Sequence, residues 1–347
     1  MLELHQNTLV FSFPEVHEDA RLTISFQRTL RIPDDGKTYP LPPGFSCFPL
    51  RHIEDYENTL PEEWISRGGV LMPMYQREAL WLYFSPHYGA GRRSAYPFAV
   101  KVYTGKINAV TGKEFQNGLH GKDMFGSKQD YLVTPGQPWL DGYCVEEGTI
   151  RQFVAMPLGD GYTAEEQITG NAEWGGIQLV VYPMDADEYE RRFPKSREDE
   201  LVCSRRAKCM EAPAPAMGLA PGGKMKQEIF KDPFGVNTFD QSAKSRCFVH
   251  LLNSQSWKAI TGEPIPSTPI DEKTYTSYGY PWFDYYDENL EALSGSPILN
   301  GLKSVSTMLK NKQVRQPGDD ENDKPRRKVI RLGPKSVREG NFWNDSI

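Results

Sequence analysis

Chain-breaking residues recur so often in this sequence that long regular elements have little room to form. The 347 residues include 30 glycines and 27 prolines, and turn signals separate most of the apolar runs from one another. Short strands joined by turns tolerate this density, whereas the long amphipathic helices of a bundle do not. The sequence therefore predicts a mainly β chain.

Apolar and polar residues alternate in the runs between these turns. In the segment Arg21–Phe26, the side chains of Leu22, Ile24 and Phe26 fall on one face, as expected for a half-buried strand. The segment Gln129–Met184 contains several such runs separated by turns. Because no strand–helix–strand rhythm accompanies them, we predict an antiparallel β-sandwich or jelly-roll-like fold.

Composition divides the chain into four regions, and its length allows two domains. Residues 1–190 carry most of the strand patterns and form the predicted β-sandwich-like domain. Residues 191–225 are charged and then rich in Pro, Ala and Gly, which predicts a linker. Residues 226–312 are expected to form a smaller α+β region, and residues 313–347 a flexible, polar, partly basic tail.

Two helix starts have clear capping signals. Thr163 and Glu166 have the spacing of a capping box, in which each side chain satisfies an otherwise unpaired backbone N–H. Ser296-Pro297 begins a second predicted helix, over 297–310, with serine at the N-cap and proline at the first position. The apolar face of this second helix would consist of Ile298, Leu302, Val305 and Leu309.

Charge, motifs and cysteine usage exclude several classes of protein. The net charge is −6, which argues against a chain that coats nucleic acid, except through the basic segment 325–335. The sequence has no transmembrane run, no signal peptide and no nucleotide-binding glycine motif, so we expect no cofactor. Five widely spaced cysteines do not form a disulfide framework. These features favour a cytoplasmic protein.

One candidate for catalysis is a thiol nucleophile. Cys144 could be activated by His120 or His52 as general base, with Glu146 or Glu147 orienting the imidazole. However, Cys144 falls within a predicted strand and has no known nucleophile motif around it. The alternative interpretation is a buried cysteine that packs as a small hydrophobic residue.

A metal site is a second candidate. Asp284 and Asp287 lie in one short segment and could bind a hard cation through oxygen ligands. Their spacing does not match any known cation-binding loop. The alternative is that they are surface carboxylates, with Asp287 capping a helix.

Aromatic residues provide the third and most distinctive signal. The segment Tyr275–Tyr286 holds five tyrosines, a tryptophan and a phenylalanine in twelve residues. Tyrosine and tryptophan are enriched at interfaces because they bury much area and keep a polar tip. The candidate binding residues are Tyr280, Trp282, Phe283, Tyr285, Tyr286, Trp139 and Trp174. Packing in the core of the smaller region is the alternative interpretation.

From these patterns we expect a non-enzymatic binding or structural protein. Its aromatic-rich surface would engage a protein partner or a second copy of the chain. One alternative is a hydrolase-type enzyme with a pocket between the two folded regions. A third possibility is a carbohydrate-binding module, since sandwich folds with exposed Trp and Tyr often bind glycans.

Overall fold

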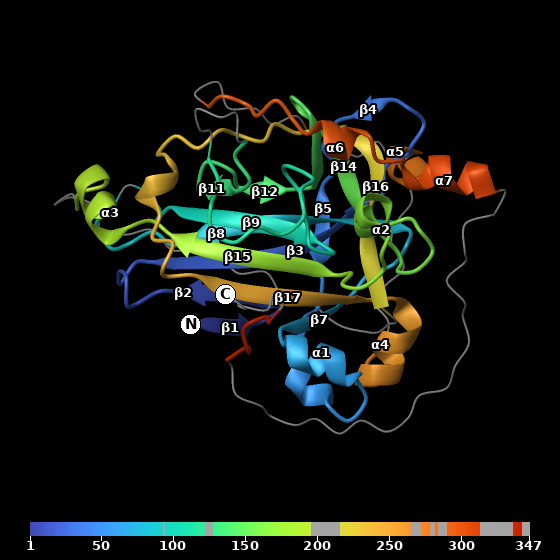
Figure 1. The fold of residues 1–347 in the computed structure, drawn as a ribbon, viewed down its shortest axis with the longest axis horizontal. Coiled ribbons are helices and arrows are strands. Elements are labelled where there is room, and N and C mark those ends of the chain that lie inside the picture. The colour runs from blue at the N-terminus through green and yellow to red at the C-terminus, as the bar shows by residue number, and fades with distance from the viewer. Residues whose placement is uncertain are drawn as a thin grey trace.

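The computed structural model in Figure 1 describes residues 1–92, 94–121, 128–195, 216–264, 272–277, 282–283, 290–312 and 336–341. Strand makes up 38% of the structure and helix 18%, with a large antiparallel sheet. The sequence-based prediction of a mainly β chain is therefore confirmed.

All strands of the described residues belong to one sheet of 17 strands. They are β1 (Leu2–His5), β2 (Thr8–Ser12), β3 (Arg21–Leu30), β4 (Thr38–Tyr39), β5 (Gly44–Cys47), β6 (Arg51–His52), β7 (Val70–Pro73), β8 (Glu78–Pro86), β9 (Phe98–Thr104), β10 (Ile107–Asn108), β11 (Leu132–Thr134), β12 (Trp139–Leu140), β13 (Gly142–Glu146), β14 (Thr149–Pro157), β15 (Ile177–Pro183), β16 (Ala216–Lys226) and β17 (Ser245–Leu252).

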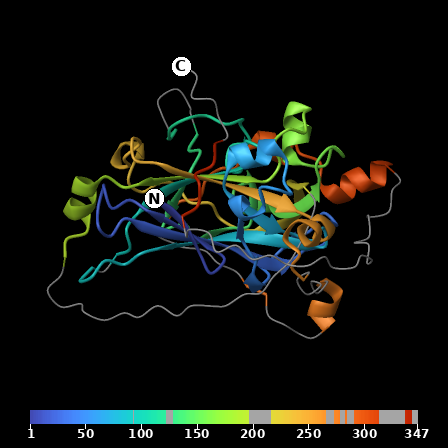
Figure 2. The same cartoon turned by 90° about the horizontal axis from the view of Figure 1, so that it is seen from below.

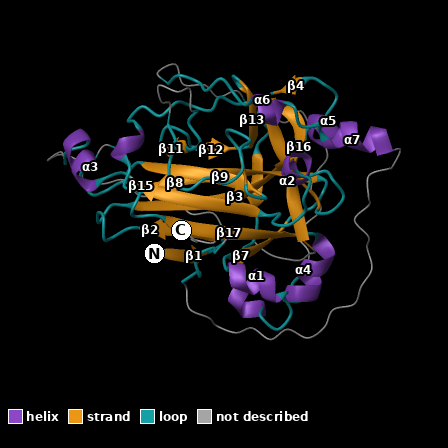
Figure 3. Ribbon diagram, viewed as in Figure 1, coloured by secondary structure: helices purple, strands orange, loops and turns teal. Residues whose placement is uncertain are grey.

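The helices are short and lie outside the sheet, as Figure 3 shows. They are α1 (Glu62–Arg67), α2 (Ala164–Thr169), α3 (Ala186–Arg192), α4 (Ser254–Thr261), α5 (Glu272–Ser277), α6 (Pro297–Asn300) and α7 (Val305–Lys312), with the 3-10 turns η1 (Ile53–Tyr56) and η2 (Val236–Thr238). In the described part of the chain, no helix has the length and apolar character needed to cross a membrane.

The sheet folds into two layers that face each other. One layer has the strand order β1–β2–β3–β8, and the other has the order β7–β17–β15–β9–β11. At one end β14 pairs with β8 and with β16, and β16 continues to β17, so these two strands connect the layers. Figures 1 and 2 show the long strands of both layers and the crossing pair β14 and β16.

The main hydrophobic core contains inward side chains of both layers. On β3 the alternating residues Leu22, Ile24 and Phe26 are fully buried, as the sequence pattern predicts. They share one core cluster with apolar residues of β8, β9, β15 and β17. A continuous buried core of this kind is the main source of stability in a two-layer β fold.

Strand β16 differs from the sequence-based expectation, which assigned residues 191–225 to a linker. Its glycines are needed because neighbouring groups approach its backbone closely. A Cβ on Gly222 would lie 2.9 Å from Val154 Cγ1, and a Cβ on Gly223 would lie 2.5 Å from the backbone oxygen of Pro33. Gly222 and Gly223, which contribute to the linker prediction, are therefore needed because neighbouring chain segments pack against the backbone of β16.

Strand β17 comes from the region 226–312 that the sequence separates from the β domain. It pairs antiparallel with β15 and parallel with β7, in the middle of one layer. Its residues Cys247, Val249 and Leu251 belong to the same core cluster as β3 and β8. The strands of the two predicted regions thus share one sheet and one core.

The helix predicted over 297–310 forms as two helices instead of one. α6 ends at Asn300, and α7 begins at Val305 after a short break. The hydroxyl of Ser304 accepts a hydrogen bond from the backbone N–H of Thr307 at 3.3 Å, so Ser304 acts as the N-cap of α7. Leu299, Leu302, Val305 and Leu309 are buried, whereas Ile298, which the prediction placed on the apolar face, is 46% exposed.

Candidate functional site

Cys144 lies on β13 and is 1% exposed. Burial raises the pKa of its thiol to about 12. The backbone N–H of Cys144 donates to Ala109, and its carbonyl accepts from Ser296. A thiol nucleophile needs a thiolate and access to a substrate. Cys144 has neither, and in the described residues no hydrogen bond joins it to His120.

Glu146, at the end of β13, does not orient a histidine. Its carboxylate lies 3.2 Å from the ammonium of Lys224 on β16, and about half of its side chain is exposed. This pair is a surface ion pair between neighbouring strands, which contributes little to stability.

His120 does contact a carboxylate, but that carboxylate is Asp130. The backbone N–H of His120 donates to Asp130 Oδ1 at 3.0 Å, and His120 Nδ1 lies 2.9 Å from Asp130 Oδ2. Asp130 precedes β11, and its side chain is 7% exposed. A carboxylate can only accept, so Nδ1 carries the proton and Nε2 is left as the basic nitrogen.

Asp130 also holds the buried ammonium of Lys101 on β9. Lys101 Nζ lies 2.8 Å from Asp130 Oδ2 and donates to the carbonyls of Gln116 at 2.8 Å and Gly118 at 2.6 Å. These three acceptors satisfy all three N–H groups of the ammonium. Burial lowers the pKa of Lys101, and the adjacent Asp130 opposes that shift.

The His120 side chain is 42% exposed, although its partner carboxylate is buried. Its Nε2 has no hydrogen-bond partner in the part of the chain that the structure describes. The lone pair on Nε2 can therefore accept a proton or a hydrogen bond from a group that approaches from solvent. We call His120, Asp130 and Lys101 the open histidine site.

The structure separates the two tryptophans predicted for binding. Trp139 on β12 lies edge-to-face with Trp81 of β8, with 6.0 Å between ring centroids, and Trp81 contacts Tyr83 in the same way at 5.9 Å. Tyr83 is 39% exposed. We call Trp81, Tyr83 and Trp139 the aromatic trio.

Trp174 lies in a different place and has cationic partners. The ammonium of Lys106 lies 3.4 Å from its ring centroid, and the guanidinium carbon of Arg67 lies 4.3 Å from it. Arg67 is buried. These two cation–π contacts hold the half-buried Trp174 ring in place without a ligand.

The aromatic segment 275–286 is described only in part. Trp282 packs against Tyr39 and Tyr275, and the backbone of Phe283 pairs with Leu41, which leaves the Phe283 ring 48% exposed. The remaining candidates lie outside the described residues, as does the basic segment 325–335. They are Tyr280, Tyr285, Tyr286, Asp284 and Asp287. Among the described residues, no group of three or more His, Cys, Asp or Glu side chains could hold a metal ion.

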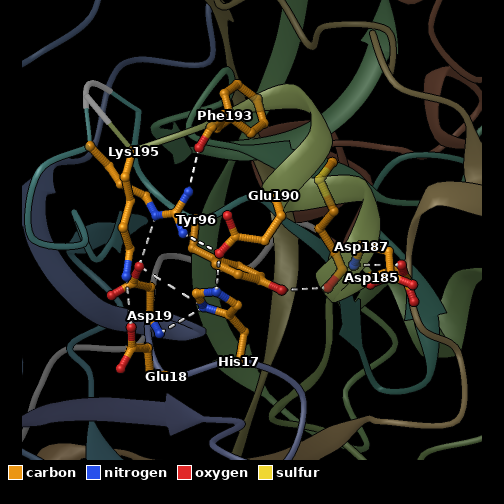
Figure 4. A network of polar contacts seen from close by, with 11 residues as sticks. His17, Glu18, Asp19, Tyr96, Asp185, Asp187, Glu190, Phe193 and Lys195 are labelled. Carbon is orange, nitrogen blue, oxygen red and sulfur yellow. Dashed lines mark hydrogen bonds and ion pairs between the residues drawn. The ribbon is translucent and has the colours of Figure 1, made fainter. Parts of the chain in front are cut away.

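Figure 4 shows a second histidine–carboxylate network, which the sequence analysis did not identify. His17 Nε2 lies 2.9 Å from Glu190 of α3, and His17 Nδ1 accepts from the backbone N–H of Asp19 at 3.0 Å. Arg92 donates through Nε to Asp19 at 3.1 Å and also contacts Glu190 and the carbonyl of Phe193. We call His17, Asp19, Arg92 and Glu190 the closed histidine network.

The closed histidine network uses both ring nitrogens of His17, and the Arg92 side chain is fully buried. Tyr189 packs against the His17 ring and under the Arg92 guanidinium, 4.5 Å from its centroid. The network therefore ties the β2–β3 turn to α3 and offers no free base. No sequence motif signals it, because His17 and Glu190 are 173 residues apart.

Comparisons of this chain with models of known protein families, with curated proteins and with solved structures found no match. Its function is therefore inferred from the sites described above.

Proposed function

We propose that this chain is a binding or assembly protein that contacts another protein, or a second copy of itself, through the aromatic trio. The observation that supports this proposal is the placement of three large aromatic rings on the outer face of β8 and β12, with Tyr83 39% exposed. Edge-to-face contacts fix the rings in place, so little side-chain entropy is lost when a partner covers them.

Polar side chains lie next to the aromatic trio. Gln27 pairs with Trp81, and Ser25 with Tyr83, across the β3–β8 ladder. The Gln27 amide donates to Ser25 Oγ at 3.0 Å and to Cys47 Sγ at 3.1 Å. Aromatic rings beside amide and hydroxyl groups are typical of protein-binding surfaces.

The test compares the wild-type chain with the double variant Tyr83→Ala/Trp139→Ala. Sedimentation over a wide concentration range measures self-association, and quantitative capture from a cell extract measures other partners. We expect the double variant to lose the association that the wild type shows. Tyr88→Ala is the matched control, because Tyr88 is 59% exposed but lies outside the trio. Identical behaviour of the double variant and the wild type in both measurements would contradict the proposal.

A hydrolase is the second candidate function, and the open histidine site favours it. Asp130 orients the His120 ring, and Nε2 has no partner among the described residues, as a general base requires. In such a reaction Nε2 would take a proton from water while the water oxygen adds to the substrate carbonyl. The same proton would then leave with the alcohol of an ester.

The test for hydrolysis uses a panel of activated esters. His120→Gln is expected to lower kcat by about 100-fold, the usual contribution of general base catalysis. His17→Gln is the matched control, because both nitrogens of His17 already have partners. A wild-type chain without esterase activity, or a His120→Gln variant that retains it, would remove this candidate.

A further inference from the structure

Residues Ser336–Asn341, which we call the closing segment, lie between β1 of one layer and β17 and the start of β7 in the other. We refer to the backbone edges with which the closing segment pairs as the groove. On one side Ser336 forms an antiparallel bridge with Glu3 of the edge strand β1, and the N–H of Val337 donates to Leu2 at 3.0 Å. The closing segment therefore pairs with the free edge of β1, as a strand added to the sheet would.

The other side of the closing segment pairs with the opposite layer. The N–H of Gly69 donates to the carbonyl of Arg338 at 3.0 Å, and the N–H of Gly340 donates to Arg246 of β17 at 3.1 Å. The N–H of Asn341 donates to Arg67 at 2.8 Å. Backbone hydrogen bonds on both sides make the groove specific for an extended chain.

Side chains give the groove a sequence preference. Val337 is 5% exposed and belongs to the main hydrophobic core. The hydroxyl of Ser245 donates to Glu339, and Arg338 Nε lies 3.2 Å from Glu54. The groove thus takes an apolar side chain at one position, with a basic and an acidic residue directly after it.

Two glycines lie next to the closing segment. Gly68 and Gly69 have positive φ angles of 65° and 91°. A Cβ on Gly68 would lie 3.1 Å from the carbonyl oxygen of Glu339 and 3.2 Å from that of Arg338. The absence of side chains here lets the backbone of the closing segment approach the start of β7.

We propose that this groove is a strand-exchange site, in which the closing segment of a second copy of this chain can replace the molecule's own. The closing segment itself shows which peptide fits. It follows α7 by the 23 residues 313–335, a length of chain that can span up to about 75 Å when extended. Chain length therefore does not confine the closing segment to its own molecule.

The test uses two full-length variants that are co-expressed and then oxidised. One carries Glu3→Cys and the other Ser336→Cys, so a disulfide between these positions can form only between two molecules. Residues bridged in an antiparallel pair are close enough for a disulfide. We expect a covalent heterodimer that is absent when Ser336→Cys is paired with Asp187→Cys, which lies on the exposed surface of α3.

Two further measurements make the result decisive. The double variant Glu3→Cys/Ser336→Cys should close a disulfide within one chain, which shows that the two positions can react. A free peptide of the closing-segment sequence, present during refolding of the mixed variants, should lower the heterodimer yield. The same peptide with Val337→Asp should be about tenfold less effective, because it loses the burial of that side chain.

Strand exchange is overturned if the double variant closes within one chain while the mixed variants give no heterodimer above the control. It is also overturned if both peptides act equally. The result is independent of the aromatic trio. If Tyr83→Ala/Trp139→Ala is added to both variants, heterodimer formation should persist whether or not the trio binds a partner.

Discussion

The open histidine site and the closed histidine network both contain an imidazole paired with a carboxylate, but they differ in what the second ring nitrogen does. In both, an imidazole contacts a carboxylate at 2.9 Å. In the closed histidine network the second ring nitrogen of His17 is also bonded, and 11% of its side chain is exposed. In the open histidine site 42% of the His120 side chain is exposed, and only the carboxylate end of the pair is buried.

This difference shows that a histidine–carboxylate contact alone does not identify chemistry. What distinguishes the two is the second ring nitrogen. In His17 it is bonded to the backbone, and in His120 it has no partner among the described residues. The carboxylates that contact the two imidazoles are alike in that each is also paired with a buried cation, Arg92 for Glu190 and Lys101 for Asp130. Five substitutions test this comparison.

The largest effect is expected for Asp130→Ala. Lys101 is fully buried and would keep two carbonyl acceptors but lose its only anionic partner among the described residues. Leaving a buried ammonium without its carboxylate should lower the free energy of unfolding by about 4 kcal/mol. Urea denaturation at neutral pH measures this. A loss similar to that of His120→Ala would mean that Asp130 acts only on the histidine.

Arg92→Met breaks the closed histidine network from the cation side. Asp19 would remain mostly buried without its guanidinium, and we expect a loss of about 3 kcal/mol in the free energy of unfolding. Lys195→Met is the matched control, because the Lys195–Glu18 pair is exposed and such pairs contribute little. Equal effects of the two substitutions in urea denaturation would refute this account.

Asp141 extends the comparison to a buried carboxylate whose hydrogen-bond partner is an amide. It accepts from Gln227 at 2.9 Å, and burial raises its pKa to about 7. The folded state then binds a proton more tightly than the unfolded state. Stability from this group is therefore complete below about pH 4 and is lost as the pH rises to about 7.

Asp141→Asn should remove that loss. Relative to the wild type, the variant should gain about 4 kcal/mol in the free energy of unfolding between pH 4 and pH 8, because the pKa of Asp141 is raised by about three units and each unit corresponds to about 1.4 kcal/mol. Unfolding curves across this pH range give the free energy of unfolding of both proteins. The difference between wild type and variant at each pH is the contribution of the Asp141 carboxyl group. A difference that does not change with pH would show that Asp141 is ionised in the folded state at all these pH values.

The smallest effects separate the two histidines directly. His17→Ala should cost about 1.5 kcal/mol, because it removes two hydrogen bonds and a ring packed against Tyr96 and Tyr189. His120→Ala should stay within about 0.5 kcal/mol, as for an exposed position. Thermal and urea unfolding of both variants measure the difference. If His120→Ala costs as much as His17→Ala, the open histidine site is structural.

Local patterns in the sequence predict a large part of this fold. The alternation of Leu22, Ile24 and Phe26 gives β3, and the capping box of Thr163 and Glu166 begins α2, where both reciprocal hydrogen bonds are present. These elements follow from residues close in sequence, which is why single-sequence patterns find them.

The features that the sequence does not predict depend on distant partners. Glycines in β16 look like a linker until the crowding by Val154 and Pro33 is known. Ser304 interrupts the helix predicted over 297–310 because a serine can cap a new helix as well as sit within one. In the candidate site, the sequence predicts His120 but not its partner Asp130, since no pattern marks an aspartate ten residues away.

The position of the closing segment also bears on how the chain is made. β1 is synthesised before the closing segment, and among the described residues one edge of β1 is paired by residues more than 330 positions later. During translation the backbone groups of that edge stay unpaired until the closing segment has left the ribosome. Unpaired strand edges on nascent chains are sites of misassociation, so neighbouring chains on one messenger RNA would meet at β1.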